Sequence, residues 1–174
     1  DYRIYKKSID ARNKNDIFYN YTVEISCKNE EKIKNAQKVI GTKDIVIEIK
    51  RKSNTRPIII GAGPAGLFSA LTLVKNGIKP IVIEQGKNVD ERKADVDEFL
   101  KSGKLNTMSN VQFGEGGAGT FSDGKLTSGI HNPLCKNVLQ EFYNFGAPKQ
   151  ILYMNKPHIG TDNLINIIKN MRNK

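Results

Sequence analysis

The feature that most constrains this chain is a short apolar run that meets three closely spaced glycines. Residues 58–60 are three isoleucines, which is typical of a strand buried on both faces of a parallel sheet. Gly61, Gly63 and Gly66 follow in the spacing G-x-G-x-x-G. A tight turn placed between an apolar strand and a helical pattern predicts the first half of a βαβ unit.

The helical pattern begins directly after these glycines. Its apolar positions are Leu67, Ala70, Leu71 and Val74. They lie on one face of a helix, and Gly77 stands where a helix commonly ends. Residues 79–84, KPIVIE, form a second apolar run and predict a second strand. The sequence therefore predicts a Rossmann-like α/β fold, a doubly wound parallel sheet with helices.

The three glycines have separate mechanical roles in a dinucleotide site. Gly61 permits the tight turn out of the strand, Gly63 lets a pyrophosphate approach the backbone, and Gly66 lets the helix pack closely on the strand. The free N–H groups and the positive dipole end of the helix then face the phosphates. Pro64 is tolerated in the first turn, where its missing N–H would have no partner.

A carboxylate completes this predicted site. Glu84 ends the second strand, 18 residues after Gly66. At that place it accepts hydrogen bonds from an adenosine ribose, and its charge repels a 2′-phosphate. The residues thus favour FAD or NAD over NADP and leave the choice between FAD and NAD open. No Walker lysine and no G-x-S-x-G pattern are present, which disfavours a nucleoside triphosphatase and a serine hydrolase.

A second stretch (residues 110–126) is denser in glycine than a plain connection needs. Its glycines are Gly114, Gly116, Gly117, Gly119 and Gly124. Bare backbone amides suit an anion or a flat ring, and Thr120 and Ser122 add side-chain hydroxyls. The alternative is a flexible surface connection, but Phe113 and Phe121 favour an ordered, buried loop.

Residues 1–56 have the pattern of a separate small α/β unit. Residues 16–26 alternate in the manner of a strand, residues 29–41 have helical spacing, and residues 44–50 place Ile45, Ile47 and Ile49 on one face of a strand. They predict a βαβ-like domain. The polar, proline-ended stretch that follows predicts a linker to a dinucleotide-binding domain over 57–174.

Charge and cysteine content exclude several other classes of protein. The chain carries 28 Lys+Arg against 18 Asp+Glu, a formal net charge of +10, which permits a polyanionic partner. The basic residues are scattered, without interleaved aromatics or a nucleic-acid motif, so the pattern favours a solvated surface over a nucleic-acid partner. Cys27 and Cys135 have no CxxC or metal-ligand spacing and predict neither a redox disulfide nor a metal site.

The two ends of the sequence carry no targeting signal. No apolar stretch approaches the length of a membrane span and no signal peptide opens the chain, which predicts a cytoplasmic protein without a membrane partner. The sequence begins with Asp1 and stops just after a helical pattern. We therefore expect an N-terminal piece of a longer chain, with the remainder of the protein as its missing partner.

Several segments together resemble a known family. These are RPIIIGAGPAGLFSALTLVKNGIKPIVIEQG (56–86), NVQFGEGGAGTFSDGKLTSG (110–129), KPHIGTDNLINIIKNMR (156–172) and KKSIDARNKNDIFYNYTVEI (6–25). They look like the FAD-dependent dehydrogenases labelled NAD(FAD)-utilising, which are two-dinucleotide-binding-domain flavoproteins. The family carries Glu-Arg-Gly after the second strand, whereas this chain has Glu84-Gln85-Gly86.

The resemblance implies FAD bound in extended form, with NAD(P)H as electron donor or acceptor. It assigns Gly61, Gly63, Pro64, Ala65 and Gly66 to the pyrophosphate, and the sequence around Glu84, Gln85 and Gly86 to the ribose. Arg92 in the next predicted helix would neutralise phosphate charge, the alternative being an exposed helix arginine. From the second glycine stretch, the residues that would pass the pyrophosphate or the isoalloxazine are Gly117, Gly119, Thr120, Ser122 and Gly124.

Three side chains are candidates for proton transfer or charge stabilisation beside a flavin. They are His131, His158 and Lys125. A histidine can move a proton during hydride transfer, and a lysine can stabilise an anionic reduced flavin. A structural or solvated role is the alternative for each, and it is the favoured one for His131 and Lys125.

These observations predict an FAD-dependent oxidoreductase whose small-molecule substrate the sequence does not reveal. In such proteins the chemistry is the flavin's, and the protein supplies position and electrostatics. Two alternatives stay open: a dinucleotide-binding module without turnover, and an RNA-modifying flavoprotein. We expect this chain by itself to hold FAD weakly and to be inactive.

Overall fold

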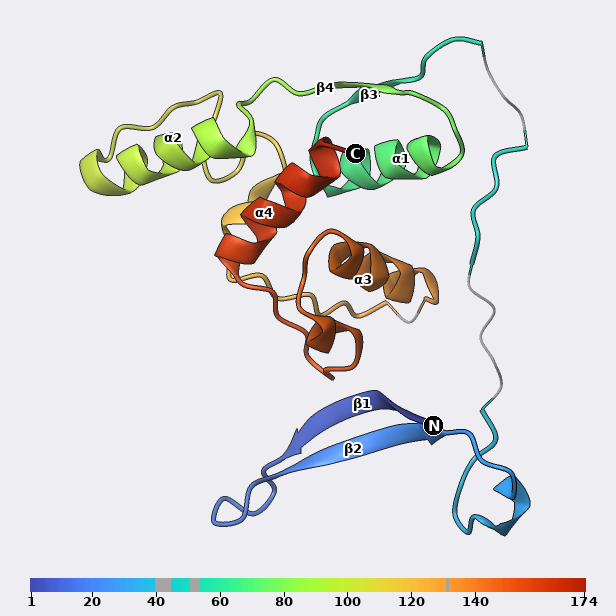
Figure 1. Cartoon of the computed structure of the whole chain (residues 1–174). Coiled ribbons are helices and arrows are strands. Elements are labelled where there is room, and N and C mark those ends of the chain that lie inside the picture. Colours follow the sequence, from blue (N-terminus) through green and yellow to red (C-terminus); the bar gives the residue numbers. More distant parts are fainter. Residues whose placement is uncertain (40–44, 51–53, 131) are drawn as a thin grey trace.

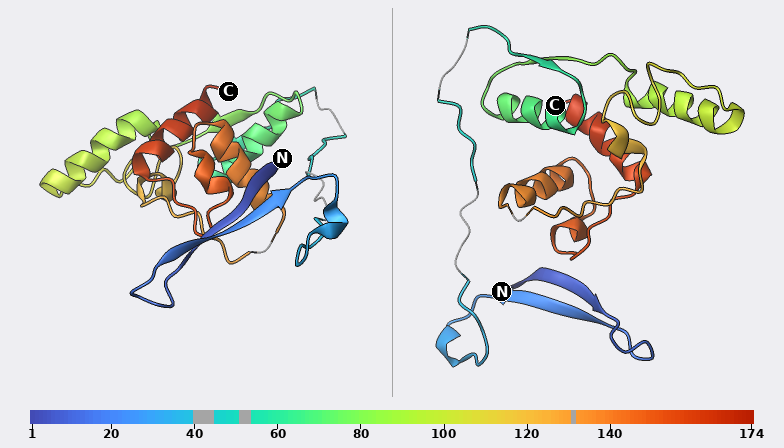
Figure 2. Two further views of the ribbon diagram at one scale, coloured as in Figure 1. Left: turned by 60° about the horizontal axis from the view of Figure 1, so that its bottom comes forward. Right: turned by 180° about the vertical axis from the view of Figure 1, so that it is seen from behind.

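The computed structural model describes residues 1–39, 45–50, 54–130 and 132–174. Figure 1 shows an N-terminal hairpin at one end, a short two-stranded sheet at the other, and helices between them. The right-hand view in Figure 2 again shows the hairpin to one side of the helical body. The fold is mixed α/β, and the parallel sheet lies in the part of the chain that contains the first glycines.

The N-terminal segment is an antiparallel hairpin. Strand β1 (Tyr2–Asp10) pairs with β2 (Phe18–Ile25), with a register shift between Ile4 and Lys6. The outer edge of β1 reaches the body: the Lys7 amide donates to the Tyr153 carbonyl over 2.8 Å. The prediction of a strand over 16–26 is confirmed, but its partner is the preceding strand.

The predicted βαβ-like domain is wrong in its helix and its second strand. Only the 3-10 helix η1 (Glu30–Lys32) forms among the described residues of 29–39, and none of its residues is buried. Residues 45–50 belong to no strand. They run extended, held where the Ile49 amide donates to Oδ1 of Asn76 over 2.9 Å. A short isolated helix that buries no apolar face is marginal in water, and residues 40–44 and 51–53 of this region lie outside the described part.

The strand–turn–helix–strand prediction is confirmed. Strand β3 (Ile58–Ile60) and strand β4 (Ile81–Ile83) pair in parallel, and helix α1 (Pro64–Lys75) connects them. Gly77 follows α1 with φ +74°, the left-handed conformation that ends helices. Leu67 and Leu71 are the buried residues of α1.

The expectation that residues 58–60 are buried on both faces is wrong. Ile58 is 62% exposed and Ile60 is 85% exposed. Successive side chains of a strand point to opposite faces, and α1 covers the face that Ile59 occupies. Among the described residues the sheet contains only β3 and β4, so its other face remains open to solvent.

Three further helices build the body. Helix α2 (Val89–Ser102) follows β4, α3 (Leu134–Asn144) follows the second glycine stretch, and α4 (Thr161–Arg172) lies centrally. Two short 3-10 helices are η2 (Ala118–Phe121) and η3 (Lys149–Leu152). In the described residues no helix has the length and apolarity to cross a membrane.

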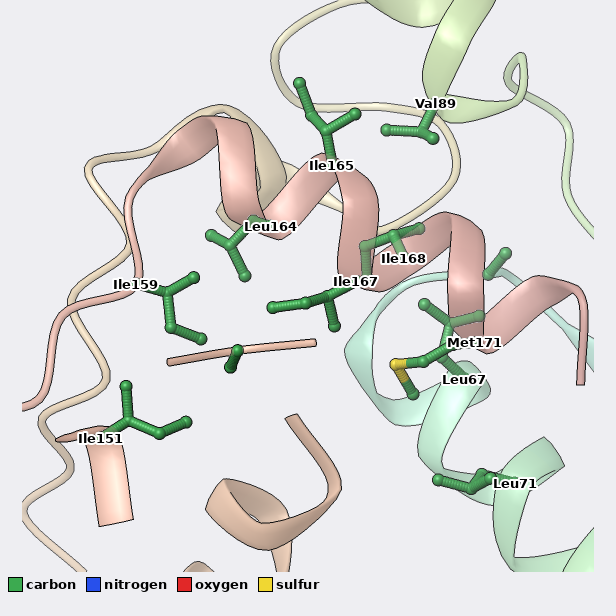
Figure 3. Close-up of a cluster of buried hydrophobic side chains, with 12 residues drawn as sticks. Leu67, Leu71, Val89, Ile151, Ile159, Leu164, Ile165, Ile167, Ile168 and Met171 are labelled. Atoms are coloured by element: carbon green, nitrogen blue, oxygen red, sulfur yellow. The ribbon is translucent and has the colours of Figure 1, made fainter. Parts of the chain in front are cut away.

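The core is organised around α4. Its buried residues are Leu164, Ile165, Ile167, Ile168 and Met171. Figure 3 shows Met171 beside Leu67 of α1, Ile165 pointing toward Val89 of α2, and Leu164 on the side of Ile159. Gly160 is the N-cap of α4, and the Thr161 hydroxyl donates to the Ser122 carbonyl. Helix α4 is thus tied to the second glycine stretch.

Candidate dinucleotide site

The first glycine loop (residues 61–66) leads from β3 directly into the N-terminus of α1. Gly61 has φ +96°, a conformation that glycine adopts without strain. A Cβ on Gly66 would lie 1.9 Å from the Gly61 carbonyl oxygen, so helix and strand approach each other as closely as the spacing predicts. No described side chain caps α1, so the N–H groups of its first turn have no side-chain acceptor at the cap.

Gly63 differs from Gly66 in what surrounds it. A Cβ built on Gly63 would meet no atom within 4 Å, and its φ of −73° is open to other residues. Glycine is therefore not required there by the protein's own packing. Free space over the N-terminus of an uncapped helix is a place where an anion is stabilised by N–H groups and the helix dipole.

Glu84 follows β4 and reaches back to the first glycine loop. Its carboxylate accepts a hydrogen bond from the Ala62 amide over 2.7 Å and one from the Gly86 amide over 2.8 Å. The two bonds use one oxygen each. Since a carboxylate oxygen has two lone pairs, Glu84 retains acceptor capacity for a ribose hydroxyl while it orders the two turns. The Gln85 side chain beside it is exposed.

The second glycine loop (residues 110–126) packs against the first. The Gly116 amide donates to the Ala62 carbonyl over 2.8 Å. A Cβ on Gly117 would lie 3.0 Å from Cδ of Pro64, and one on Gly86 would lie 2.4 Å from Cα of Gly114. Two loops far apart in sequence thus meet at the start of α1. The alternative of a loose surface connection is excluded for the part around residues 114–117.

Arg92 is completely buried. Its guanidinium points into the second glycine loop and donates to main-chain carbonyl oxygens there. The alternative of an exposed helix arginine is therefore wrong. Burial lowers the pKa of this guanidinium, and the carboxylates of Glu84 and Glu115 act in the opposite direction.

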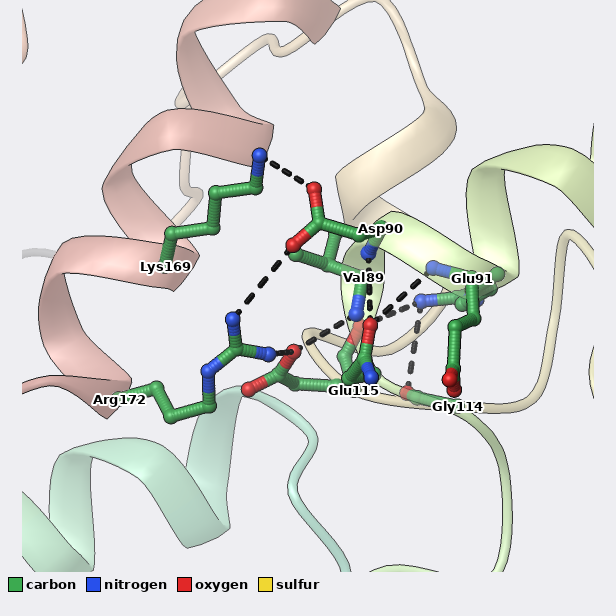
Figure 4. A network of polar contacts seen from close by, with 9 residues as sticks. Val89, Asp90, Glu91, Gly114, Glu115, Lys169 and Arg172 are labelled. Carbon is green, nitrogen blue, oxygen red and sulfur yellow. Dashed lines mark hydrogen bonds and ion pairs between the residues drawn. The ribbon is translucent and has the colours of Figure 1, made fainter.

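Glu115 joins the second glycine loop to two helices. Its Oε2 accepts from the Val89 amide at the start of α2 and from Nη1 of Arg172 at the end of α4, both over 2.7 Å. Figure 4 shows Asp90 beside this pair, where its carboxylate bonds Lys169 and Arg172. These cations, Lys169 first, lower the pKa of Asp90. The network fixes the buried side of the loop.

A cavity of about 150 Å³ lies between α1, η2 and α4. Its apolar wall includes Leu67, Phe142 and Met171. The predicted site residues that line it are Pro64, Gly119, Thr120, Ser122, Gly124 and Lys125. Much of the second glycine loop therefore borders a space that also touches the first turn of α1.

The two described catalytic candidates lie together at the rim of this region. Lys125 and His158 form an isolated antiparallel bridge, in which the Ile159 amide donates to the Gly124 carbonyl and the Leu126 amide to the Pro157 carbonyl. Both side chains are exposed. The hydrogen bond and charge of Asp123 raise the pKa of Lys125. His131 lies outside the described residues.

Sequence reasoning missed two parts of this site. Glu115 and Arg172 were not expected to take part. The signal for Glu115 is a single acidic residue within a run of glycines, since a carboxylate there must find donors if the run is buried. The partner on α4 leaves no local trace in the sequence.

The comparisons with known proteins agree with this geometry. Residues 54–103 match a family described as FAD binding domain, and residues 1–26 match a domain of unknown function. An uncharacterized protein of Clostridium beijerinckii is 50% identical over 179 residues, which are 97% of this chain and 33% of that protein. The chain thus spans about a third of that relative's length. The FAD-binding match covers β3, α1, β4 and all of α2, and supports an FAD-binding flavoprotein family.

Proposed function

We propose that this chain carries the dinucleotide-binding part of an FAD-dependent oxidoreductase of the dehydrogenase type. The single observation that carries the proposal is the first glycine loop, which places open space over Gly63 at the uncapped start of α1. The match of residues 54–103 to an FAD binding domain supports it. The proposed substrate is a small molecule that exchanges a hydride or electrons with the flavin.

The residues present fit the adenosine diphosphate half of the cofactor. Gly63, Ala65 and Gly66 would bind the pyrophosphate through their amides, and Glu84 would accept from the ribose while it keeps Ala62 in place. Bound FAD would supply hydride and electron transfer. The chain's own contribution is to fix the two glycine loops, to exclude water from their buried sides and to repel a 2′-phosphate.

Lys125 and His158 enter this proposal as groups near the reacting end of the cofactor. They lie on one short bridge beside the cavity rim. A lysine there would stabilise negative charge, and a histidine would hold or release a proton. Both side chains are exposed, which leaves room for a substrate beside them. Substitution of each residue would distinguish a role in catalysis from that of a solvated surface side chain.

A fluorescence titration of FAD with the purified chain tests the proposal. We expect saturable quenching, and we expect Gly63→Ala to weaken binding while the melting temperature stays unchanged. The added methyl group meets no protein atom and would stand where the pyrophosphate approaches. Gly129→Ala is the matched control, because its Cβ also meets nothing within 4 Å and the residue has no assigned role in cofactor binding. Equal affinity of Gly63→Ala and the unmodified chain would contradict the assignment.

The alternative dinucleotide is NAD, which the carboxylate of Glu84 also suits. Parallel titrations with FAD, NAD and NADP separate the two cases. We expect FAD to bind best and NADP worst, since a 2′-phosphate would face the Glu84 carboxylate. A preference for NAD, with no flavin binding, would support a binding module without flavin chemistry and would overturn the oxidoreductase proposal.

A further inference from the structure

Among the described residues, the most buried charged side chain is Arg92, which lies inside the second glycine loop and not in an ion pair. Arg92 is 0% exposed. Burying an unpaired charge is strongly unfavourable, and buried charges are therefore paired or fully hydrogen-bonded. The partners of Arg92 show which of these solutions the protein uses.

The guanidinium binds a ring of main-chain carbonyls. Nε donates to the carbonyl of Asn110 over 2.7 Å, and Nη2 donates to that of Val111 over 2.8 Å. Nη1 donates to the carbonyl of Glu115 over 2.7 Å and to that of Gly117 over 2.9 Å, with the Gly114 carbonyl at 3.4 Å. One side chain therefore gathers oxygens from both ends of the segment 110–117.

The loop is shaped around this side chain in two further ways. Gly114 has φ +122°, and a Cβ there would lie 2.6 Å from Cδ of Arg92. On the other side, the guanidinium carbon lies 4.8 Å from the centre of the Phe121 ring, a cation–π distance. The backbone conformation, the missing Cβ and the aromatic ring all fit a planar cation at this position.

The same loop segment carries the contact to the first glycine loop. Gly116 donates to the Ala62 carbonyl, and Gly117 packs against Pro64. Arg92 donates to the carbonyl of Gly117 itself and to that of Glu115, the residue before Gly116. Arg92 thus lies on the inner side of the second glycine loop, and the proposed cofactor position lies on the other side of it, at the start of α1.

We propose that Arg92 is a positioning residue, which holds the second glycine loop against the first and acts on a bound dinucleotide through that loop, not by contact with a phosphate. The inference rests on the proposed function for its effect on FAD. The ordering of the loop is independent of it. A fully buried guanidinium that donates to carbonyls offers no face to a phosphate.

The charge and geometry of arginine are both required in this arrangement. A guanidinium presents five N–H groups in a rigid plane, while an ammonium is a compact point charge with three. Lysine in place of Arg92 would keep the charge but could not reach carbonyls on both ends of the segment. Arg92→Lys therefore tests whether the hydrogen bonds of the guanidinium, and not its charge alone, order the loop. The matched control is Lys93→Ala, which removes the exposed neighbouring cation that pairs with Asp97.

The first test is hydrogen exchange of the unliganded chain. We expect Arg92→Lys to lose protection in residues 110–117 by at least about tenfold, since buried carbonyls lose charge-assisted hydrogen bonds. Protection in α4 reports whether the fold is kept. Lys93→Ala is expected to match the unmodified chain in both regions. Unchanged protection of 110–117 in Arg92→Lys would overturn the proposal.

The second test adds FAD and a rescue. In Arg92→Ala we expect weaker FAD binding and partial recovery with millimolar guanidinium, which fills the vacated position, but no recovery with urea or sodium chloride. A direct phosphate role predicts the opposite pattern: intact loop protection without FAD, and loss of affinity for FAD but none for adenosine. If the unmodified chain binds no FAD, the proposed function fails while the exchange experiment still decides the role of Arg92.

A third measurement needs no variant. In the unmodified chain, the Arg92 Nε–H should exchange slowly with solvent in ¹⁵N NMR spectra because it is buried and bound to the Asn110 carbonyl. Its resonance should move little when FAD is added. Fast exchange without FAD, or a large shift with coupling to phosphorus on binding, would overturn the proposal even if no Arg92 variant folds.

Discussion

The N-terminal hairpin and the second glycine loop show opposite relations between regular structure and burial. The hairpin has a nearly continuous antiparallel ladder, yet Asp10 is the one buried residue of its strands. The second glycine loop contains only the short helix η2, yet Gly114, Glu115 and Thr120 are buried in it. The regular main-chain pairing of the hairpin is therefore not sufficient to bury its side chains. The loop buries residues although it has almost no regular secondary structure.

The difference lies in what satisfies the main chain. In the hairpin, carbonyls and amides bind each other across the ladder, so the side chains are free to stay in solvent. In the loop, carbonyls bind Arg92 and amides bind Ala62 and Lys87 across the fold. Each such bond brings a distant element into contact. Buried main-chain polar groups must have partners, and in this loop finding them assembles the site.

The largest effect on stability is expected from adding a side chain where the backbone of Gly86 touches the second glycine loop. Gly86→Ala adds a Cβ that would lie 2.4 Å from Cα of Gly114, and backbone on both sides has little room to move. We expect a loss of about 3 kcal/mol in the free energy of unfolding, at the upper end for overpacked sites. Urea unfolding measures it. Gly119→Ala, in open space, serves as control, and an equal small change in both variants would refute the close approach.

The next largest effect is expected at the buried carboxylate of the loop. Glu115→Gln removes the charge that meets Arg172 while it keeps an acceptor for the Val89 amide. We expect a loss of about 2 kcal/mol, because a buried charge-assisted bond is weakened. Asp97→Asn, which breaks the exposed pair with Lys93, should cost at most about 0.5 kcal/mol. Equal losses of stability in Glu115→Gln and Asp97→Asn would contradict a special role for the buried carboxylate.

A smaller, pH-dependent effect is expected in the hairpin. Hydrogen bonds from Arg12 lower the pKa of Asp10 from 3.8 to about 2. A carboxyl with a lower pKa in the folded state stabilises the fold above its unfolded value, and that stabilisation disappears as the pH falls toward 2. The effect is small because the Arg12 side chain is 89% exposed.

Melting temperatures of the unmodified chain and of Asp10→Asn test this window. We expect a constant difference at and above neutral pH that shrinks once the pH falls below about 4. Asp16→Asn, in the exposed turn of the same hairpin, is the control. A difference that persists unchanged at the acid end would show that the Asp10 carboxylate does not stabilise the fold through its charge.

The smallest effect is expected on the outer surface of the hairpin. Tyr19 is 54% exposed, and its ring lies 3.9 Å from Nζ of Lys7. Exposed cation–π contacts contribute roughly 0.5–1 kcal/mol, so Tyr19→Leu should change stability by no more than this. Thermal unfolding measures it. A loss as large as that of Gly86→Ala would mean that the hairpin has a core of its own.

Prediction from sequence succeeded for segments whose pattern is local. The three isoleucines, the glycines and the apolar face of α1 specify strand, turn and helix within about twenty residues of each other, because strand and helix periods act over short distances. It failed at residues 29–39, where helical spacing was present without a surface to cover. It failed for Ile58 and Ile60 because burial depends on neighbouring elements, not on the strand.

The sequence by itself determined the βαβ unit, the conformation of Gly61 and the carboxylate at the end of β4. Each follows from residues that are close along the chain and from steric limits that hold in any protein. Only the tertiary structure decided that Arg92 faces inward, that Glu115 meets Arg172, and that the two glycine loops touch. Those contacts join residues separated by 18 to 57 positions. They exist because buried charges and carbonyls must find partners wherever the packed elements bring them together.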